Sequence, residues 1–233
     1  MFRTLLPIIF LIVKLHAAAG DNLVRKDLGF RYTLKENGNG SLKYNIPEYS
    51  FETFTSEDGK VYKKPVMMDA GKISNEGQPD LPSSSTFIAI DPQKTYSINV
   101  NIISSSMTEN IEILPKNSWD NNSDITFEKG LSYNLQGHYP EKIAMISEPM
   151  TMRELTLVNI TVTPFRFYPQ EKRLEEFTEI EIELIETGVS DNIPFRPLKR
   201  SRAFEPIYES YVANYSTLER ENIPYQRPSI LYV

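Results

Sequence analysis

Apolar and polar residues alternate along much of the chain. The clearest stretch is residues 179–184, where Ile180, Ile182 and Leu184 alternate with three glutamates. Residues 96–102 repeat this pattern with serine and asparagine on the polar side. A period of two places apolar side chains on one face of a β-strand and polar side chains on the other. Both stretches therefore predict strands with one buried face and one face in water.

Turn signals join other stretches. Residues 49–55 and 60–68 flank Asp58-Gly59, a dipeptide typical of tight hairpin turns, so they predict a β-hairpin. A further short strand is expected at residues 85–90, because this apolar run lies between two prolines.

The apolar stretch at residues 155–167 changes phase partway along. At first the apolar residues stand at odd positions, Leu155 and Leu157, and then they stand at even positions, Val158, Ile160 and Val162. Such a change within one strand predicts a β-bulge, and Pro164 marks an edge or another irregularity. A polar connection at residues 168–173 then leads into the glutamate-bearing strand, which predicts a long hairpin.

The character of the chain changes after residue 187. Residues 188–202 hold two prolines and four basic residues, so we expect an exposed linker. Within residues 203–215, Phe204, Ile207, Tyr208 and Tyr211 have helical spacing and Pro206 suits a first turn. We therefore predict three parts after residue 19: an all-β sandwich at 20–187, an exposed linker with a short helix at 188–229, and an extended tail at 230–233.

Residues 1–19 have the features of a secretion signal. Arg3 is followed by a short apolar run at residues 5–13 and then by small residues, which predicts cleavage between Ala19 and Gly20. The run is too short to span a bilayer; an uncleaved anchor and a buried N-terminal strand are the alternatives. No later stretch is long and apolar enough for a membrane span, so we expect a protein that is secreted or held in the cell envelope.

Composition restricts the chemistry. The net charge is −6, and without residues 1–19 the chain keeps 23 basic against 31 acidic residues. An acidic domain with no basic block argues against nucleic-acid binding. The absence of cysteine excludes a thiol nucleophile, a thiolate zinc site and thiol redox chemistry. One histidine, His138, remains after the signal, so the usual general base is scarce. We expect no catalytic residue, no metal site and no cofactor.

Three further features are assigned structural rather than functional roles. Glu179, Glu181 and Glu183 suggest a calcium or acid–base cluster, but without converging loop ligands they are typical of a solvated strand face. His138 is expected in a loop or turn. Trp119 is a candidate for stacking on sugars, but a single tryptophan is expected to pack partly into a core.

A rigid turn is predicted at Gly77-Gln78-Pro79-Asp80-Leu81-Pro82. Gly77 tolerates a positive φ, and each proline fixes its own φ and holds the preceding residue extended. This turn, together with the strand that follows it, resembles the pro-domain family of gingipain-type cysteine peptidases. The resemblance covers roughly residues 60–233 and continues, in order, through four later segments: 168–174, 201–204, 214–215 and 227–232.

The resemblance implies a β-sandwich placed before a caspase-like catalytic domain, which assists folding and blocks the active-site cleft until it is cut away. Its implied partner is that peptidase domain, in cis or in trans, and residues 230–233 look similar to the first core strand of the catalytic domain. The catalytic cysteine and histidine of the family have no counterpart here, so the chain is expected to be non-catalytic. The alternatives are an independent extracellular binding or adhesion module and, less favoured, a hydrolase with paired carboxylates.

Removal of such a domain requires a cut in exposed chain between the sandwich and Ile230. Arg202, Arg220 and Arg227 are the candidates if the enzyme is selective for arginine. Arg227 is disfavoured because Pro228 restrains its backbone, and Arg202 borders a helix start. Arg220 has no apolar residue after it until Ile223, so we predict a cut between Arg220 and Glu221.

Overall fold

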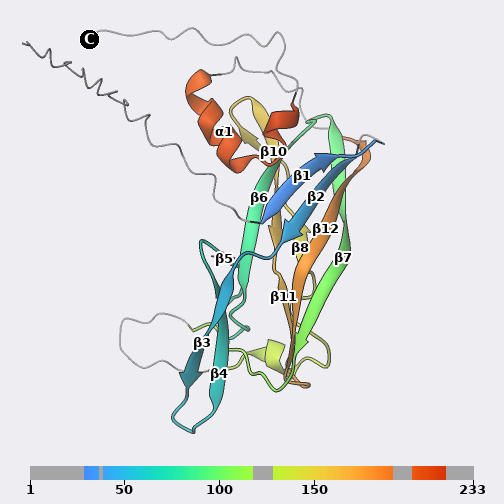
Figure 1. Ribbon diagram of the computed structural model, residues 1–233. Helices are drawn as coiled ribbons and strands as arrows, with labels where there is room; N and C mark the ends of the chain where they lie inside the picture. Colours follow the sequence, from blue (N-terminus) through green and yellow to red (C-terminus); the bar gives the residue numbers. More distant parts are fainter. Residues whose placement is uncertain (1–28, 37–38, 118–127, 191–200, 219–233) are drawn as a thin grey trace, which may run out of the picture.

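The computed structural model describes residues 29–36, 39–117, 128–190 and 201–218. Two antiparallel five-stranded sheets face each other (Figure 1). The first has the order β1-β2-β12-β11, with β7 also paired to β12. Its strands are β1 (Phe30–Leu34), β2 (Gly40–Asn45), β7 (Lys94–Thr108), β11 (Phe165–Tyr168) and β12 (Arg173–Val189). The all-β sandwich predicted from the sequence is confirmed.

The second sheet has the order β5-β6-β10-β8, with β9 also paired to β10. Its strands are β5 (Gly71–Lys72), β6 (Pro82–Ile90), β8 (Ala144–Ile146), β9 (Met150–Met152) and β10 (Leu155–Val162). A separate hairpin of β3 (Tyr49–Thr55) and β4 (Val61–Met67) extends from one end of the sandwich (Figure 1). This hairpin confirms the prediction made from Asp58-Gly59.

The main core lies between the two sheets. In the first sheet Ile180 is paired with Tyr44 and Ile182 with Leu42, and all four side chains are buried. The second sheet contributes its own apolar side chains to the same cluster: Ile88, Ala144, Val158, Ile160 and Val162. The alternation at residues 179–184 therefore confirms the predicted strand, with its apolar side chains facing the opposite sheet.

Glu179, Glu181 and Glu183 of β12 lie on the outer face of the first sheet, where they are half-buried and paired. Lys43 Nζ lies 2.7 Å from Glu179 Oε1, and Lys35 Nζ lies 3.0 Å from Glu181 Oε1 and 3.7 Å from Glu183 Oε1. They are spaced along a strand rather than converging, and among the described residues no group of acidic or histidine side chains is arranged to hold a metal ion.

The β-bulge predicted in the 155–167 stretch is wrong. β10 pairs with β6 in an unbroken register from Thr156 to Val162. The apolar residues change from odd to even positions because both faces of the strand are buried. Val158, Ile160 and Val162 face the other sheet, whereas Leu155 and Leu157 face outward and are covered by the C-terminal segment. Beyond Pro164 the chain enters the other sheet as β11, which forms the predicted hairpin with β12.

A second apolar cluster closes the end of the sandwich near the β3–β4 hairpin. It combines residues from strands and loops: Met67, Leu81, Ile111, Ile113, Tyr133, Phe165, Phe167 and Leu174. Residues 111–116 reach it as extended chain, with isolated bridges from Ile113 to Lys63 and from Pro115 to Pro79. The sequence pattern did not predict this cluster, because its members come from short segments without periodicity.

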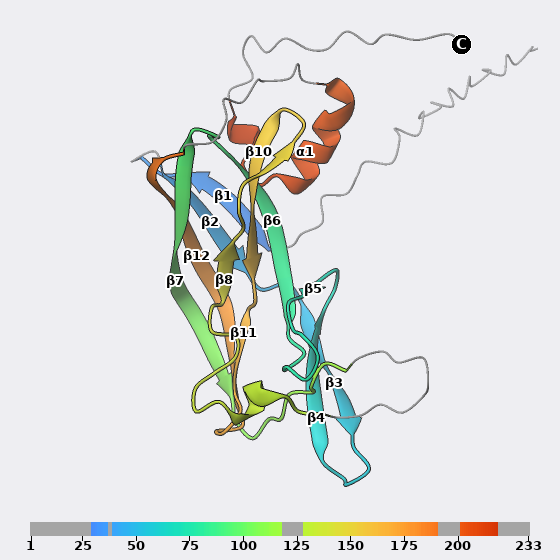
Figure 2. The same cartoon turned by 180° about the vertical axis from the view of Figure 1, so that it is seen from behind.

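Within the predicted exposed linker at 188–229, residues 204–218 pack on the sandwich instead, whereas the described residues 188–190 and 201–203 are exposed or half-buried. The 3₁₀ turn η2 (Arg202–Phe204), the helix α1 (Glu205–Tyr211) and the 3₁₀ turn η3 (Tyr215–Thr217) pack on the outer face of the second sheet (Figure 2). The short helix itself is confirmed. Tyr211, which the helical spacing placed on the buried face, is 50% exposed, and Val212 and Tyr215 are buried instead.

α1 is the only α-helix among the described residues, and it spans seven of them. Within the part of the chain that the structure describes, no helix is long and apolar enough to cross a membrane.

Candidate functional site

The predicted turn at Gly77–Pro82 connects two distant parts of the chain. Gly77 has a φ of +73°, and its N–H donates a hydrogen bond to the carbonyl oxygen of Lys116 at 2.8 Å. The carbonyl oxygen of Gly77 accepts from the N–H of Gly130 at 2.8 Å, and the N–H of Lys116 donates to the carbonyl oxygen of Gln78 at 2.8 Å. The turn therefore holds Lys116 and Gly130 beside each other.

The remainder of the turn is fixed from within. Ser74 Oγ donates to the carbonyl oxygen of Pro79 and accepts from the N–H of Leu81 at 3.3 Å. The side chain of Leu81 is fully buried in the second apolar cluster. The carboxylate of Asp80 is also buried, and two ammonium groups compensate its charge: Lys64 at 3.3 Å and Lys72 at 3.5 Å. These contacts fix the conformation of the turn at Ser74, Asp80 and Leu81 as well as at Gly77.

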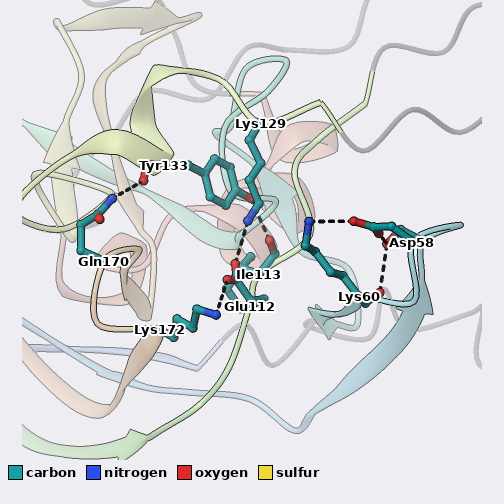
Figure 3. Close-up of polar contacts among 9 residues, drawn as sticks. Asp58, Lys60, Glu112, Ile113, Lys129, Tyr133, Gln170 and Lys172 are labelled. Carbon is teal, nitrogen blue, oxygen red and sulfur yellow. Dashed lines mark hydrogen bonds and ion pairs between the residues drawn. The ribbon is translucent and has the colours of Figure 1, made fainter.

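A charged cluster lies beside this turn, at the end of the sandwich (Figure 3). Glu112 accepts from Lys129 Nζ at 2.9 Å and lies 3.4 Å from Lys172 Nζ. The ammonium group of Lys129 also lies over the rings of Tyr133, 5.0 Å from its centroid, and Tyr62, 5.3 Å away. We call Glu112, Lys129 and Lys172, with the two tyrosines, the Glu112 cluster.

The Glu112 cluster is anchored to the backbone below it. Tyr133 Oη donates to the carbonyl oxygen of Ile113 at 2.8 Å, and Gln170 Nε2 donates to the carbonyl oxygen of Tyr133 at 2.8 Å (Figure 3). Burial raises the pKa of Tyr133, so its hydroxyl stays protonated and able to donate. The cluster is therefore a network of ion pairs and cation–π contacts held on a hydrogen-bonded backbone.

The tip of the β3–β4 hairpin carries an exposed charged pair (Figure 3). Lys60 Nζ lies 2.7 Å from Asp58 Oδ2, and Ser56 Oγ also donates to this carboxylate. The hydrogen bonds from Lys60 and then from Ser56 lower the pKa of Asp58 to about 2. Asp58 therefore remains charged at any pH at which the domain is expected to operate.

The C-terminal segment has its own polar attachment to the sandwich. Asn214 Oδ1 accepts from the N–H of Ala89 in β6, and Asn214 Nδ2 donates to the carbonyl oxygen of Ala89, both at 2.8 Å. The N–H of Ala213 donates to the carbonyl oxygen of Phe87, also at 2.8 Å. Asn214 is 5% exposed. Before the structure, Asn214 was singled out as part of segment 214–215, on which the sequence resemblance partly rested.

The site residues predicted from the sequence fall into two groups. Gly77, Pro79, Leu81 and Pro82 form the rigid turn described above, and Arg202 lies exposed in η2. Other predicted positions lie outside the described residues and stay predictions: the signal cleavage at Ala19 and Gly20, the cuts at Arg220 and Arg227, and the packing of Trp119. His138 lies in a loop, as expected, with its ring edge against Tyr168.

The chain matches a protein family described as Propeptide_C25 over residues 32–219. Among curated proteins, gingipain R2 of Porphyromonas gingivalis is 27% identical in an alignment of 188 residues that covers 77% of this chain. Gingipain R1 of the same organism is 27% identical in an alignment of 157 residues that covers 65% of this chain. The matched region spans 25% of the length of gingipain R2 and 16% of that of gingipain R1.

Two solved structures have a similar fold. One comes from the complex of the pro- and mature domains of RgpB of P. gingivalis: it has a TM-score of 0.67 and 24% identity, and the match covers 82% of this chain and 98% of that one. The other comes from a study of zymogenic latency in gingipain K of P. gingivalis, with a TM-score of 0.55, 16% identity and coverage of 72% and 97%.

Proposed function

The chain belongs to the Propeptide_C25 family and is a gingipain-type pro-domain, and from this premise we propose that it holds an exported cysteine peptidase latent and assists its folding. The family match is the main support for the proposal. It covers residues 32–219, which hold the described structure from β1 to η3. The chain is thus a non-catalytic propeptide, and it contains no cysteine.

The Glu112 cluster and the turn at Gly77–Pro82 present charged side chains at one end of the sandwich, where a partner could contact them. These features are compatible with inhibition in which the domain occupies the active-site cleft of the peptidase. An inhibitor in the same chain as its enzyme acts at high effective concentration, so it does not need tight binding of its own. The excess of acidic residues favours a partner with a basic rim and mainly assists orientation.

We also propose that the domain acts outside the cytoplasm, as a secreted or cell-envelope protein. The apolar run and the small residues before Gly20 support this. Sequencing the N-terminus of exported material should give Gly20 as the first residue. Recovery of a chain that still begins at Met1 in a membrane fraction would contradict it.

Latency is tested by adding the purified domain to mature peptidase. The chain without residues 1–19 is titrated against a mature gingipain R and against the peptidase, if any, encoded immediately downstream of this chain. We expect saturable loss of peptide hydrolysis, and recovery of activity when the domain is digested. A heat-unfolded sample of the same chain serves as the matched control.

Refolding of the denatured peptidase with and without the domain tests the folding role, with recovered activity measured after digestion of the domain. Equal inhibition by folded and unfolded chain would contradict specific blocking. Unchanged hydrolysis by both peptidases at saturating domain would overturn the latency proposal, and unchanged refolding yield would overturn the folding role.

A further inference from the structure

The outer face of the second sheet is an apolar surface that the C-terminal segment, residues 201–218, covers (Figure 2). The sheet contributes Leu155 and Leu157 from β10 and Phe87 and Ala89 from β6. The segment contributes three side chains that are at most 2% exposed: Tyr208, Val212 and Tyr215. Apolar side chains of this size, buried against a strand face, provide most of the stabilisation of such a contact.

Polar contacts fix the segment in one register. A parallel bridge joins Val212 to Phe87 in β6, and the N–H of Ala213 donates to the carbonyl oxygen of Phe87 at 2.8 Å. One residue on, the side-chain amide of Asn214 bonds both the N–H and the carbonyl oxygen of Ala89. A side-chain amide has the same donor and acceptor groups as a peptide, so Asn214 stands in for a neighbouring strand at this edge of β6.

The start of the segment is held separately. The guanidinium carbon of Arg153 lies 4.2 Å from the ring centroid of Phe204, in the geometry of a cation–π contact. Arg153 lies in the connection between β9 and β10 and has a φ of +56°. Apolar contacts, edge pairing and this stacking together are what a sheet edge uses to bind a peptide.

We propose that this face is a peptide-binding site whose ligand is the chain's own segment 203–218, and that the segment stays bound after the chain is cut between Arg202 and Ala203. Only one part of this inference rests on the proposed function, namely that such a cut is a step in maturation. Arg202 and Ala203 are both exposed. A cut there leaves the sandwich attached, without a covalent bond, to everything that follows, so separation requires a cut beyond Leu218, the side on which Arg220 and Arg227 lie.

The test uses the full chain with a recognition sequence for a site-specific protease inserted between Phe195 and Arg196, upstream of Arg202. After complete cutting, size-exclusion chromatography and mass spectrometry show whether the two pieces elute together. We expect co-elution in native buffer and separation in urea. Asn214→Ala removes both side-chain hydrogen bonds to Ala89 and should raise the dissociation constant of the pieces about tenfold or more. Asn99→Ala, an exposed asparagine of β7, is the matched control and should change nothing.

A competition experiment covers the case in which Asn214→Ala prevents folding. A labelled synthetic peptide of residues 203–218 is added in excess to the cut wild-type chain, and the same peptide with Asn214→Ala is added in parallel. We expect the first to displace the C-terminal piece and the second to do so at least about tenfold less well. Separation of the wild-type pieces in native buffer, or equal displacement by the two peptides, overturns the proposal. No peptidase is present, so failure here leaves the latency proposal untouched.

Discussion

Replacing Gly77 by alanine tests whether the rigid turn holds the end of the sandwich together. Gly77 has a φ of +73°, and a Cβ at this position would lie 3.0 Å from Gly130 N and 3.2 Å from Gly130 Cα. The left-handed conformation costs a non-glycine residue about 1–2 kcal/mol. The close contact is with backbone, so Gly130 must shift by a few tenths of an ångström, which weakens its hydrogen bond to the carbonyl oxygen of Gly77, worth about 1 kcal/mol net. The expected loss is about 2–3 kcal/mol in the free energy of unfolding.

Two other glycines separate these effects. Gly59 has a φ of +79° but nothing within 4 Å of an added Cβ, so Gly59→Ala should lose only the conformational part, about 1–2 kcal/mol. Gly137 also has nothing within 4 Å and lacks a positive φ, so Gly137→Ala should be neutral or slightly stabilising, by about 0.4–1 kcal/mol. Urea unfolding followed by circular dichroism gives all three values. If Gly77→Ala is no worse than Gly59→Ala, the contact with Gly130 carries no energy and the reasoning is wrong.

Three further predictions concern pH, packing and activity. Burial raises the pKa values of Tyr44, Tyr49 and Tyr208 to about 12, whereas the pKa of tyrosine in the unfolded chain is about 10. Their contribution to stability is therefore complete below pH 10 and is lost as the pH rises from about 10 to 12. The urea midpoint of unfolding should be constant from pH 7 to 9 and fall above pH 10, and the fall should be smaller in Tyr208→Phe. Leu157→Ala and Ile160→Ala should each cost about 2–5 kcal/mol, but only Leu157→Ala should make the C-terminal segment more sensitive to limited trypsin digestion, because only Leu157 lies beneath it. Finally, the purified domain should hydrolyse no peptide, ester or glycoside; activity that follows the folded domain through purification would refute its assignment as non-catalytic.

The sequence predicted those elements whose determinants are local. Asp58-Gly59 located the β3–β4 hairpin, because Gly59 takes the positive φ that closes the short loop between the paired residues Thr55 and Val61. The alternation at residues 179–184 located β12 for a similar reason, since one solvated face leaves a period of two. Where both faces are covered the period disappears, and β10 was therefore misread as a bulged strand.

The candidate site was predicted less well, because its contacts join residues far apart in the chain. Glu112 meets Lys172 only after β11 and β12 have formed their hairpin, and no spacing rule relates the two positions. Asn214 is 125 residues from Ala89, and asparagine in a polar tail reads as exposed until its strand partner is known. The turn at Gly77 was recognised, since glycine and proline fix local backbone angles, but its role in joining Lys116 to Gly130 was not.

The packing of the C-terminal segment changes where the folded domain ends. A boundary at residue 187 falls inside β12, which runs to Val189, and leaves Leu155 and Leu157 facing water on a strand whose other face is already buried. Exposed apolar strand faces and unpaired edges favour aggregation. A domain that contains no cysteine has no disulfide to compensate for such a loss. The segment up to Leu218 is therefore part of the fold, and a pro-domain expressed without it should be less stable and more prone to associate than one that retains it.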